Sequence, residues 1–388
     1  MSEARLIRSG NSPAFLAEGT PLRRLPRWPQ QTRPKEFMDR FEDRALVYDC
    51  FWHAGGEHIL LVGPPPMNLQ PVLREAKYLA LPSQTPLRPV YHASLSTMIT
   101  ELSGVPAGTT GVRLTLCGQV FNMPVQPNHS ADLAGRRVLF TMSKDNDLEW
   151  IAEWARWHAR IHGADGIVFF DNGSTRYGAD EIEQTLLGVT GIEKVAVQSW
   201  PYTYGMTDPA LSLNPFYILF LQVSSMSVAL RRYAAQARGL LNCDIDELAS
   251  TPPGTTIFDL CKDSSHGLVV MRGRFIEPEA DAEAPETGRT HRHYCRYHAD
   301  PKQAVSRPNK WVIDPTRPWV KKLSVRPYMH WIEGRPWFSK STPEGVFYRH
   351  FRGISTNWKH ERTAPRHQTQ DDLIQDAEFA QLVARHAF

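Results

Sequence analysis

Two short acidic segments carry the residue types best suited to chemistry. The segment 169–174 (FFDNGS) ends in a turn sequence, and the segment 241–248 (LNCDIDEL) places Asp244, Asp246 and Glu247 at the end of an apolar run. Clustered carboxylates repel one another and lose hydration where a strand meets a cleft, so this placement calls for a compensating cation. A divalent metal ion that holds a diphosphate would supply that cation. Asp244 and Asp246 occupy alternating positions, so on an extended segment they would point the same way and could share one ion. The alternative is a charged strand end in water.

Alternating strands and helices after residue 135 are predicted to position both segments. A helix follows the first strand, with Asn146 as its N-cap and Gly163 as the residue just beyond its end. Ligands of open α/β sheets bind at the carboxyl ends of strands, where Asp171 and Asp244 both fall. The expected strands of this doubly wound half are 138–142, 166–170, 195–200 and 240–243.

A long helix is expected to lead into the second acidic segment. Asn214 and Pro215 form a good N-cap and N1 pair, and Gly239 is expected to close the helix. The stretch 216–230 is the most apolar of the chain, but it is too short to span a bilayer and contains polar residues. It is therefore expected to be buried in the protein.

The composition of the region before residue 136 predicts a different organisation. Residues 1–37 are basic and rich in proline, and are expected to form an extended or disordered arm. Short β-like runs separated by Pro, Gly and Asn turns predict a small β-sandwich over residues 38–135. An α/β domain is expected over 136–360, followed by a helical tail over 361–388.

Composition and charge limit the possible functions. The chain has 388 residues, of which 41% are hydrophobic and 22% charged, as in a soluble globular protein. Its five cysteines form no C-x-x-C pair, and no secretory signal is visible, so a cytoplasmic protein with reduced thiols is expected. Residues 286–366 contain 17 Lys+Arg against 6 Asp+Glu, which favours a polyanionic ligand or an anionic surface. No nucleic-acid-binding motif accompanies this charge, so nucleic acid is not expected as a partner.

Several segments together resemble the GT-A-fold glycosyltransferases. Residues 146–151 (NDLEWI) with Trp157 and His158, then 170–174 (FDNGS), 244–247 (DIDE) and 350–352 (HFR) follow the order of the motifs in family 92 and its bacterial family-2-like relatives. The resemblance covers roughly residues 136–360 and implies a GT-A-like, Rossmann-like domain. Leu248 replaces the Phe of the D-x-D-E-F motif. The Q-x-x-R-W signature of processive synthases is absent, so a processive synthase is not expected.

The resemblance implies roles for residues of both acidic segments. Asp246 would bind Mn²⁺ or Mg²⁺, and Asp244 would contact the ribose of a nucleotide-sugar or the metal-bound water. Asp171 would accept a hydrogen bond from the nucleotide base, although by turn chemistry alone it is a turn residue. Asn172 and Ser174 would shape that loop.

Basic residues and histidines are expected to complete the donor site. Lys144 and Asn146 follow the first strand and could face the nucleotide, although a solvated lysine is an alternative. His330 is expected to complete the metal site, with a buried structural histidine as the alternative and His350 as the competing ligand. The remaining candidates are Arg349 and Arg352, which could hold the diphosphate or lie on a solvated basic face.

The catalytic base is left open by the sequence. Inverting transfer needs a carboxylate that deprotonates the acceptor hydroxyl, and Glu277, Glu247 and Asp263 are the candidates. Retaining transfer would need no such base. Glu149 is better explained by helix capping, and His158 by burial on the apolar face of the helix.

These observations predict a non-processive, metal-dependent glycosyltransferase of polysaccharide biosynthesis. It would transfer a sugar, with inversion, from a UDP-sugar to a glycan or glycolipid acceptor, and its basic regions could contact an anionic membrane surface. A catalytically inactive carbohydrate-binding or scaffold protein of a polysaccharide assembly system is the main alternative. Nucleotidyl transfer ranks last, because no Gly-rich phosphate loop is present.

Overall fold

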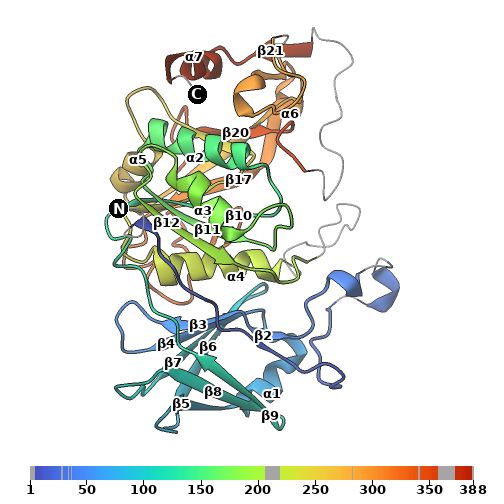
Figure 1. Cartoon of the computed structure of the whole chain (residues 1–388), viewed down its shortest axis with the longest axis vertical. Helices are drawn as coiled ribbons and strands as arrows, with labels where there is room; N and C mark the ends of the chain where they lie inside the picture. The colour runs from blue at the N-terminus through green and yellow to red at the C-terminus, as the bar shows by residue number, and fades with distance from the viewer. Residues whose placement is uncertain are drawn as a thin grey trace.

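An eight-stranded mixed sheet forms the centre of the molecule, with strand order β12-β11-β10-β13-β17-β15-β20-β14 (Figure 1). This computed structural model describes residues 5–27, 29–33, 35, 37–205, 219–281, 283–339, 341–356 and 372–386. The strands of the sheet are β10 (Arg137–Ser143), β11 (Gly166–Asp171), β12 (Lys194–Ser199), β13 (Gly239–Asn242), β14 (Glu247–Ser250), β15 (Leu268–Ile276), β17 (Val305–Ile313) and β20 (Phe347–Phe351).

Four neighbouring strands form the parallel half of this sheet. β10 pairs in parallel with both β11 and β13, and β11 pairs in parallel with β12. Leu139 and Leu241 enter one hydrophobic core, whereas Phe140 and Leu240 enter a second core on the opposite face. Strands buried on both faces produce continuous apolar runs, which is the pattern that predicted them. The α/β class and the doubly wound half are confirmed.

The strands of the other half of the sheet bring a late part of the chain next to the second acidic segment. β17 is antiparallel to β13, β15 is antiparallel to β17, and β20 is parallel to β15. β14 closes the edge by antiparallel pairing with β20, and in this register Glu247 lies opposite His350. His350, from late in the chain, therefore pairs with Glu247, which directly follows the D-I-D sequence.

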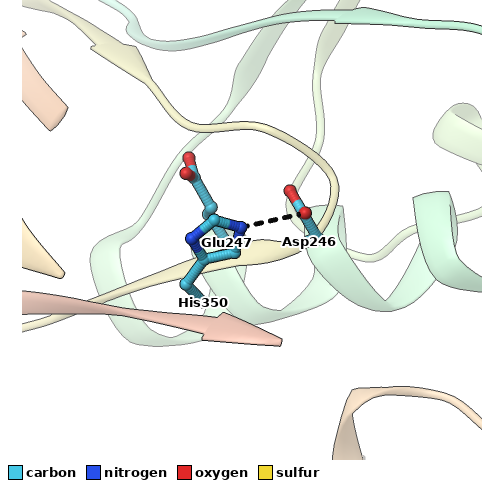
Figure 2. Close-up of side chains that lie close together, drawn as sticks. All are labelled: Asp246, Glu247 and His350. Carbon is cyan, nitrogen blue, oxygen red and sulfur yellow. Dashed lines mark hydrogen bonds and ion pairs between the residues drawn. The ribbon is translucent and has the colours of Figure 1, made fainter. Parts of the chain in front are cut away.

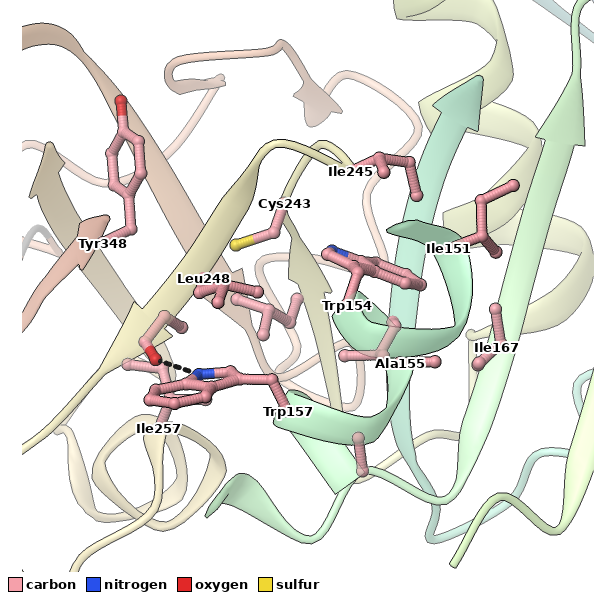
Figure 3. Packing of buried hydrophobic residues seen from close by; sticks show 14 of the residues in the cluster. Ile151, Trp154, Ala155, Trp157, Ile167, Cys243, Ile245, Leu248, Ile257 and Tyr348 are labelled. Atoms are coloured by element: carbon pink, nitrogen blue, oxygen red, sulfur yellow. Dashed lines mark hydrogen bonds between the residues drawn. The ribbon is translucent and has the colours of Figure 1, made fainter. Parts of the chain in front are cut away.

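Helix α2 (Leu148–His162) covers one face of the sheet. It begins one residue later than predicted, because Asp147 rather than Asn146 is the N-cap, and it ends at Gly163 with φ of 65° as expected. Trp154 and Trp157 are buried beneath it, and the indole nitrogen of Trp157 donates to the carbonyl of Ala249 on β14 (Figure 3). α3 (Ala179–Leu187), α5 (Ile257–Asp263) and α7 (Ala377–His386) are further helices of the chain.

Helix α4 (Phe220–Val228) lies between the large sheet and the N-terminal strands (Figure 1). It is buried as predicted, while Asn214 and Pro215, its expected start, lie outside the described residues. The prediction that Gly239 ends this helix was wrong, because Gly239 is the first residue of β13. A Cβ there would lie 2.8 Å from the Phe258 ring, so the glycine permits close packing. Within the described residues, no helix is long and apolar enough to cross a membrane.

The N-terminal region contains two small antiparallel sheets with a shared core. Cys50 and Leu61 face this core, but Phe51 and Leu60 of the same strands enter the core of the large sheet. Because the two regions share packing, the separate β-sandwich and the boundary near residue 135 remain predictions. One sheet consists of β3 (Asp49–Trp52), β4 (Ile59–Gly63), β7 (Met98–Ser103) and β6 (Arg88–Ala93), and the other of β5 (Lys77–Leu81), β8 (Gly111–Leu116) and β9 (Gln119–Pro124).

The described part of the N-terminal arm packs against the rest of the protein. The Ile7 amide donates to the Val195 carbonyl of β12 over 2.8 Å. Arg24 is buried and donates to three backbone carbonyls. The remaining strands and α-helices are short: β1 (Ala14–Phe15), β2 (Ala45–Val47), α1 (Gln70–Arg74), β16 (Arg296–His298), α6 (Pro301–Ala304), β18 (Arg326–Pro327), β19 (Ile332–Glu333) and β21 (Leu373–Gln375).

Candidate functional site

The second acidic segment forms a tight turn between β13 and β14. The Glu247 amide donates to the Asp244 carbonyl over 3.0 Å, so residues 244–247, called the acidic turn below, are not extended. The prediction that Asp244 and Asp246 share one side of an extended segment was therefore wrong. The turn breaks the two-residue alternation of a strand. Asp244 contacts Lys310, whereas Asp246 contacts His350.

Backbone hydrogen bonds fix the acidic turn in place. The Ile245 carbonyl accepts from Nε2 of the buried His291 over 2.8 Å, and the Asp246 carbonyl accepts from the Phe351 amide over 2.8 Å. Nδ1 of His291 lies 3.2 Å from the carboxylate of Glu153 on α2. Both carbonyls are thus bonded to neighbouring elements, which orients the acidic side chains before any ligand arrives.

A buried lysine supplies part of the positive charge that the three carboxylates require. Lys310 Nζ lies 2.7 Å from Asp244 Oδ2 and 2.8 Å from Glu247 Oε2, and the side chains of Lys310 and Glu247 are 2% and 3% exposed. Burial raises the pKa of Glu247, and the Lys310 ammonium opposes that rise. The neighbouring carboxylates hold the pKa of Lys310 well above its ordinary value, despite its burial. The pair is an internal, solvent-excluded part of the site.

Asp246, Glu247 and His350 form a group that could hold a metal ion. One ligand atom from each residue lies within 4.8 Å of those from the other two. Figure 2 shows the three side chains together, with His350 Nε2 3.1 Å from Asp246 Oδ2. The side chains of Asp246 and His350 are 17% and 15% exposed, so this part of the group is more open than the lysine pair.

The chemistry of this donor set suits a divalent ion. Two carboxylates and an imidazole are ordinary ligands of Mn²⁺, and carboxylates are those of Mg²⁺. Ser306 Oγ lies 3.0 Å from Nδ1 of His350, so the ring is oriented with Nε2 toward Asp246. Asp244, which was expected to share the metal, is held by Lys310 and lies outside this group.

His330 lies near the group without joining it. Its Nδ1 donates to the Asn309 carbonyl over 3.0 Å, and burial lowers the pKa of His330 to about 4. The ring is therefore neutral at neutral pH. Of the two candidate histidine ligands, His350 is the one that the structure places against Asp246.

The first acidic segment also forms a turn, at the carboxyl end of β11. Asp171 ends β11, and its Oδ1 accepts from the Ser174 hydroxyl over 2.5 Å and from the Ser174 amide over 3.1 Å. The Asn172 side chain donates to the Trp200 carbonyl over 2.7 Å. These contacts give Asp171 the role of a turn residue, and its suggested contact with a nucleotide base remains a prediction.

The segment between β10 and α2 packs beside this second turn. Lys144 is exposed, and the Asn146 side chain donates to the Ser143 hydroxyl over 2.7 Å. Asp145 accepts from the backbone amides of Thr175 and Arg176, with distances of 2.7 and 3.1 Å. The loops after β10 and β11 are therefore joined, and Lys144 stands at their exposed side.

The two candidate arginines are engaged in buried ion pairs. Arg349 is wholly buried and donates to both carboxylate oxygens of Asp376, with distances of 2.8 and 3.0 Å. Arg352 donates to Glu277 over 3.0 Å, and Glu277 is 1% exposed. Arg349 thus joins β20 to the segment before α7, and we leave it out of the proposed donor site.

The three candidate bases are placed very differently. Glu277 follows β15 beside the acidic turn but is paired with Arg352, and Glu247 is paired with Lys310. Asp263 is exposed at the end of α5, which packs against the first residues of β13 at the opposite edge of the sheet. The structure therefore does not bring Asp263 to the acidic turn.

Two residues that contribute to the site, Lys310 and His291, were not predicted from the sequence. Lys310 directly precedes the apolar run Trp311-Val312-Ile313, and a lysine at such a position is a signal of a buried cation. His291 lies in a His- and Arg-rich loop with no periodic pattern, so its contact with the acidic turn had no local signal. The expectation that His158 is a buried structural residue is confirmed, because its ring is wholly buried and bonded to Trp154 and Ala249.

Comparisons with known proteins give a partial structural similarity. No protein-family model matches the chain, and no curated protein matches it. The mannosyltransferase Ktr4p from S. cerevisiae is 12% identical, with a TM-score of 0.24, over 38% of this chain and 42% of that chain. Ktr4p in complex with GDP is 11% identical, with a TM-score of 0.24, over 38% of this chain and 43% of that chain. Family 92 membership remains a prediction, and the functional assignment rests on the site itself.

Proposed function

We propose that this chain is a non-processive, metal-dependent glycosyltransferase that uses a nucleotide-sugar donor, with a UDP-sugar as the expected donor. The observation that carries the proposal is the group formed by Asp246, Glu247 and His350 at the edge of an α/β sheet. Ligands of such sheets bind at the carboxyl ends of the parallel strands, where this group and Asp171 both lie.

Charge balance supports a divalent ion at this position. When all are ionised, Asp244, Asp246 and Glu247 carry three negative charges, of which Lys310 neutralises one. Two negative charges remain, which a divalent cation would balance. A bound cation would favour the ionised form of Glu247, whose pKa burial raises to about 7. Asp246, Glu247 and His350 would hold that ion, which neutralises charge that develops on a departing diphosphate.

The turn at Asp171 and the acidic turn would bind different parts of the donor. The turn at Asp171 would receive the nucleoside, and the exposed Lys144 would face the phosphates. The acidic turn would receive the diphosphate. Because only β10 separates β11 from β13, the strands that lead into the two turns are about 10 Å apart.

We assign no catalytic base. Inversion is the outcome expected from the resemblance, but Glu247 and Glu277 are both held in ion pairs. A general base must reach the proton that it removes, and a paired, buried carboxylate is poorly suited to that role. The identities of the sugar and of the glycan or glycolipid acceptor are likewise left to experiment.

The decisive test is a donor panel with a matched charge control. UDP-, GDP- and CMP-sugars are screened for thermal stabilisation and slow hydrolysis, with and without Mn²⁺, using the native chain, Asp246→Asn and Asp180→Asn. Asp180 is exposed on α3 and lies 3.9 Å from Arg8, so its substitution removes one negative charge and one weak surface ion pair outside the residues assigned to the donor site. We expect one donor class to stabilise the native chain and Asp180→Asn, with the effect lost in Asp246→Asn or with chelator. Absence of any donor effect would reject the proposal.

A carbohydrate-binding or scaffold protein is the second candidate. The observation in its favour is that the two carboxylates best placed to act as a base, Glu247 and Glu277, are already paired. This candidate predicts glycan binding that is independent of metal and donor. Glycan binding without donor hydrolysis, unchanged in Asp246→Asn, would support it over the transferase.

A further inference from the structure

The most exposed large apolar side chains of the described residues lie together on one turn. Trp337 is 93% exposed and Phe338 is 72% exposed. Single exposed apolar residues are common, but two adjacent aromatic rings leave an unusually large apolar surface in water, because each ring offers about 150–250 Å² for burial. This turn, residues 336–339, is called the aromatic turn below.

The aromatic turn is held by its own hydrogen bonds. The Ser339 amide donates to the Pro336 carbonyl over 3.0 Å, which places Trp337 and Phe338 at the two central positions. The Ser339 hydroxyl donates to the same carbonyl over 2.6 Å, and Arg335 donates to the Trp337 carbonyl over 3.2 Å. Outward projection of both rings is thus built into the local geometry.

A basic loop, residues 317–326, packs beside the aromatic turn. The Trp319 indole donates to the His266 carbonyl over 2.9 Å, and the His266 ring lies 4.8 Å from the Phe338 ring. The buried Arg231 donates to the carbonyls of Val320, Lys322 and Val325. This buried cation fixes the loop, and the exposed Lys321 and Lys322 project from it.

Positive charge is in excess beside the exposed rings, although Arg317 is paired with Asp314 over 2.9 Å. Residues 317–338 contain five Lys+Arg and one Asp+Glu. Glu333, the one carboxylate, is paired with Arg326. Aromatic rings at the level of lipid headgroups, with Lys and Arg beside them, are the combination that binds anionic bilayers.

We propose that the aromatic turn and the basic loop form a docking surface for an anionic lipid bilayer. Trp337 and Phe338 insert at the level of the headgroups, and Lys321, Lys322 and Arg335 contact the lipid phosphates. The proposal does not depend on the glycosyltransferase chemistry, because it uses none of the residues assigned to the donor site.

The position of the aromatic turn favours a membrane over the reacting acceptor sugar. His266 precedes β15, whereas the last residues of β15 lie beside the acidic turn. The nine residues of β15 span about 30 Å. A sugar that stacks on Trp337 is therefore too far away to be the one that reacts at Asp246.

Vesicle flotation with the full chain tests this surface. Vesicles of phosphatidylcholine alone and of phosphatidylcholine with phosphatidylglycerol are compared at low and high salt. We expect binding to the anionic vesicles only, weakened by salt and reduced at least tenfold in Trp337→Ser/Phe338→Ser. The matched control is Leu25→Ser/Val120→Ser, which removes two other exposed apolar residues, 58% and 56% exposed, and should bind like the native chain.

Two further variants separate the contributions of rings and charges. Trp337→Phe keeps an aromatic ring and should retain binding, whereas Lys321→Glu/Lys322→Glu should lose it at low salt. Circular dichroism and thermal unfolding confirm that each variant is folded. The proposal is overturned if the native chain ignores anionic vesicles, or if binding survives the loss of both rings. Binding of a soluble glycan at Trp337 without vesicle binding would also overturn it.

Discussion

The two sides of the acidic turn differ in how their charge is balanced. On one side, Lys310 and Glu247 are almost wholly buried and neutralise each other. On the other side, Asp246 and His350 are partly exposed and contact each other. Carboxylates next to one another in sequence thus have different tasks. The closed side stabilises the turn and contributes Glu247 to the metal-binding group, and the open side contributes Asp246 and His350.

This difference arises from the turn and from the strand order. Because the chain reverses between β13 and β14, Asp246 and Glu247 face different neighbours. β17 contributes Lys310 to one side, and β20 contributes His350 to the other. Removing Lys310 from the closed side should therefore affect mainly folding, and removing charge from the open side should affect mainly ligand binding.

Substitution of Lys310 should have the largest effect on stability. Lys310→Met keeps the length of the side chain but leaves Glu247 buried without a cation. Breaking a buried ion pair by removing one partner costs about 3–5 kcal/mol. Urea unfolding, followed by circular dichroism, measures the loss.

A double variant shows whether the pair itself is responsible for this effect. In Lys310→Met/Glu247→Gln the uncompensated charge is gone, so we expect most of the lost stability to return. A loss below about 1 kcal/mol for Lys310→Met alone would contradict the closed-side account.

Acid should destabilise the support beneath the closed side. His158 Nε2 accepts from the Ala249 amide, and His162 Nδ1 accepts from the Ile257 amide, so a proton on either nitrogen would face an N–H group. Burial lowers the pKa of His158 to about 3 and that of His162 to about 4. The unfolded chain therefore binds more protons below pH 6.5, and stability is lost as pH falls from 6.5 toward 4.

The expected slope is about 1.4 kcal/mol per pH unit for each histidine. Urea unfolding at pH 7.5, 6.0 and 5.0 measures it. His162→Gln can make the same two hydrogen bonds without titrating. The slope of its unfolding free energy against pH should therefore be smaller by about 1.4 kcal/mol per pH unit. A pH-independent stability over this range would show that these rings are not buried in neutral form.

Substitutions on the open side should have small effects on stability. Asp246→Asn and His350→Gln each weaken or remove the hydrogen bond between these two side chains at a partly exposed position, which costs at most about 0.5–1.5 kcal/mol. Thermal unfolding without metal measures this. A loss as large as that of Lys310→Met would mean that the two sides do not differ as described.

Substitution of Asp171, in the turn after β11, should change stability least. Asp171→Asn keeps the side-chain shape and can still accept from the Ser174 amide. We expect unfolding midpoints close to those of the native chain and weaker binding of the nucleoside diphosphate in equilibrium dialysis. Unchanged nucleotide binding would remove Asp171 from the proposed donor site.

The parallel half of the sheet was predictable because its signals are local. β10, β11, β12 and β13 are buried on both faces, so their apolar runs are visible without knowledge of their partners. Lys310 and Asp244 are 66 residues apart, and no local pattern specifies such a contact. The expected alternation of Asp244 and Asp246 failed for a related reason, since the turn is fixed by bonds from His291 and Phe351.

Arginine roles were the least predictable part of the candidate site. Arg349 and Arg352 were expected near a diphosphate because they flank His350 in sequence. Neighbours on a strand point to opposite faces, so Arg349 turns away from His350 and meets Asp376. The partner of Arg352, Glu277, lies 75 residues away in the chain.

Titration with Mn²⁺ tests the central claim most directly. Electron paramagnetic resonance counts free Mn²⁺ in the presence of the native chain, Asp246→Asn, His350→Gln and Asp180→Asn, with and without UDP. We predict one Mn²⁺ per native chain, binding that UDP strengthens, at least tenfold weaker binding in the first two variants and no change in Asp180→Asn. Equal Mn²⁺ binding by all four proteins, or none by the native chain, would contradict a metal site on the open side of the acidic turn.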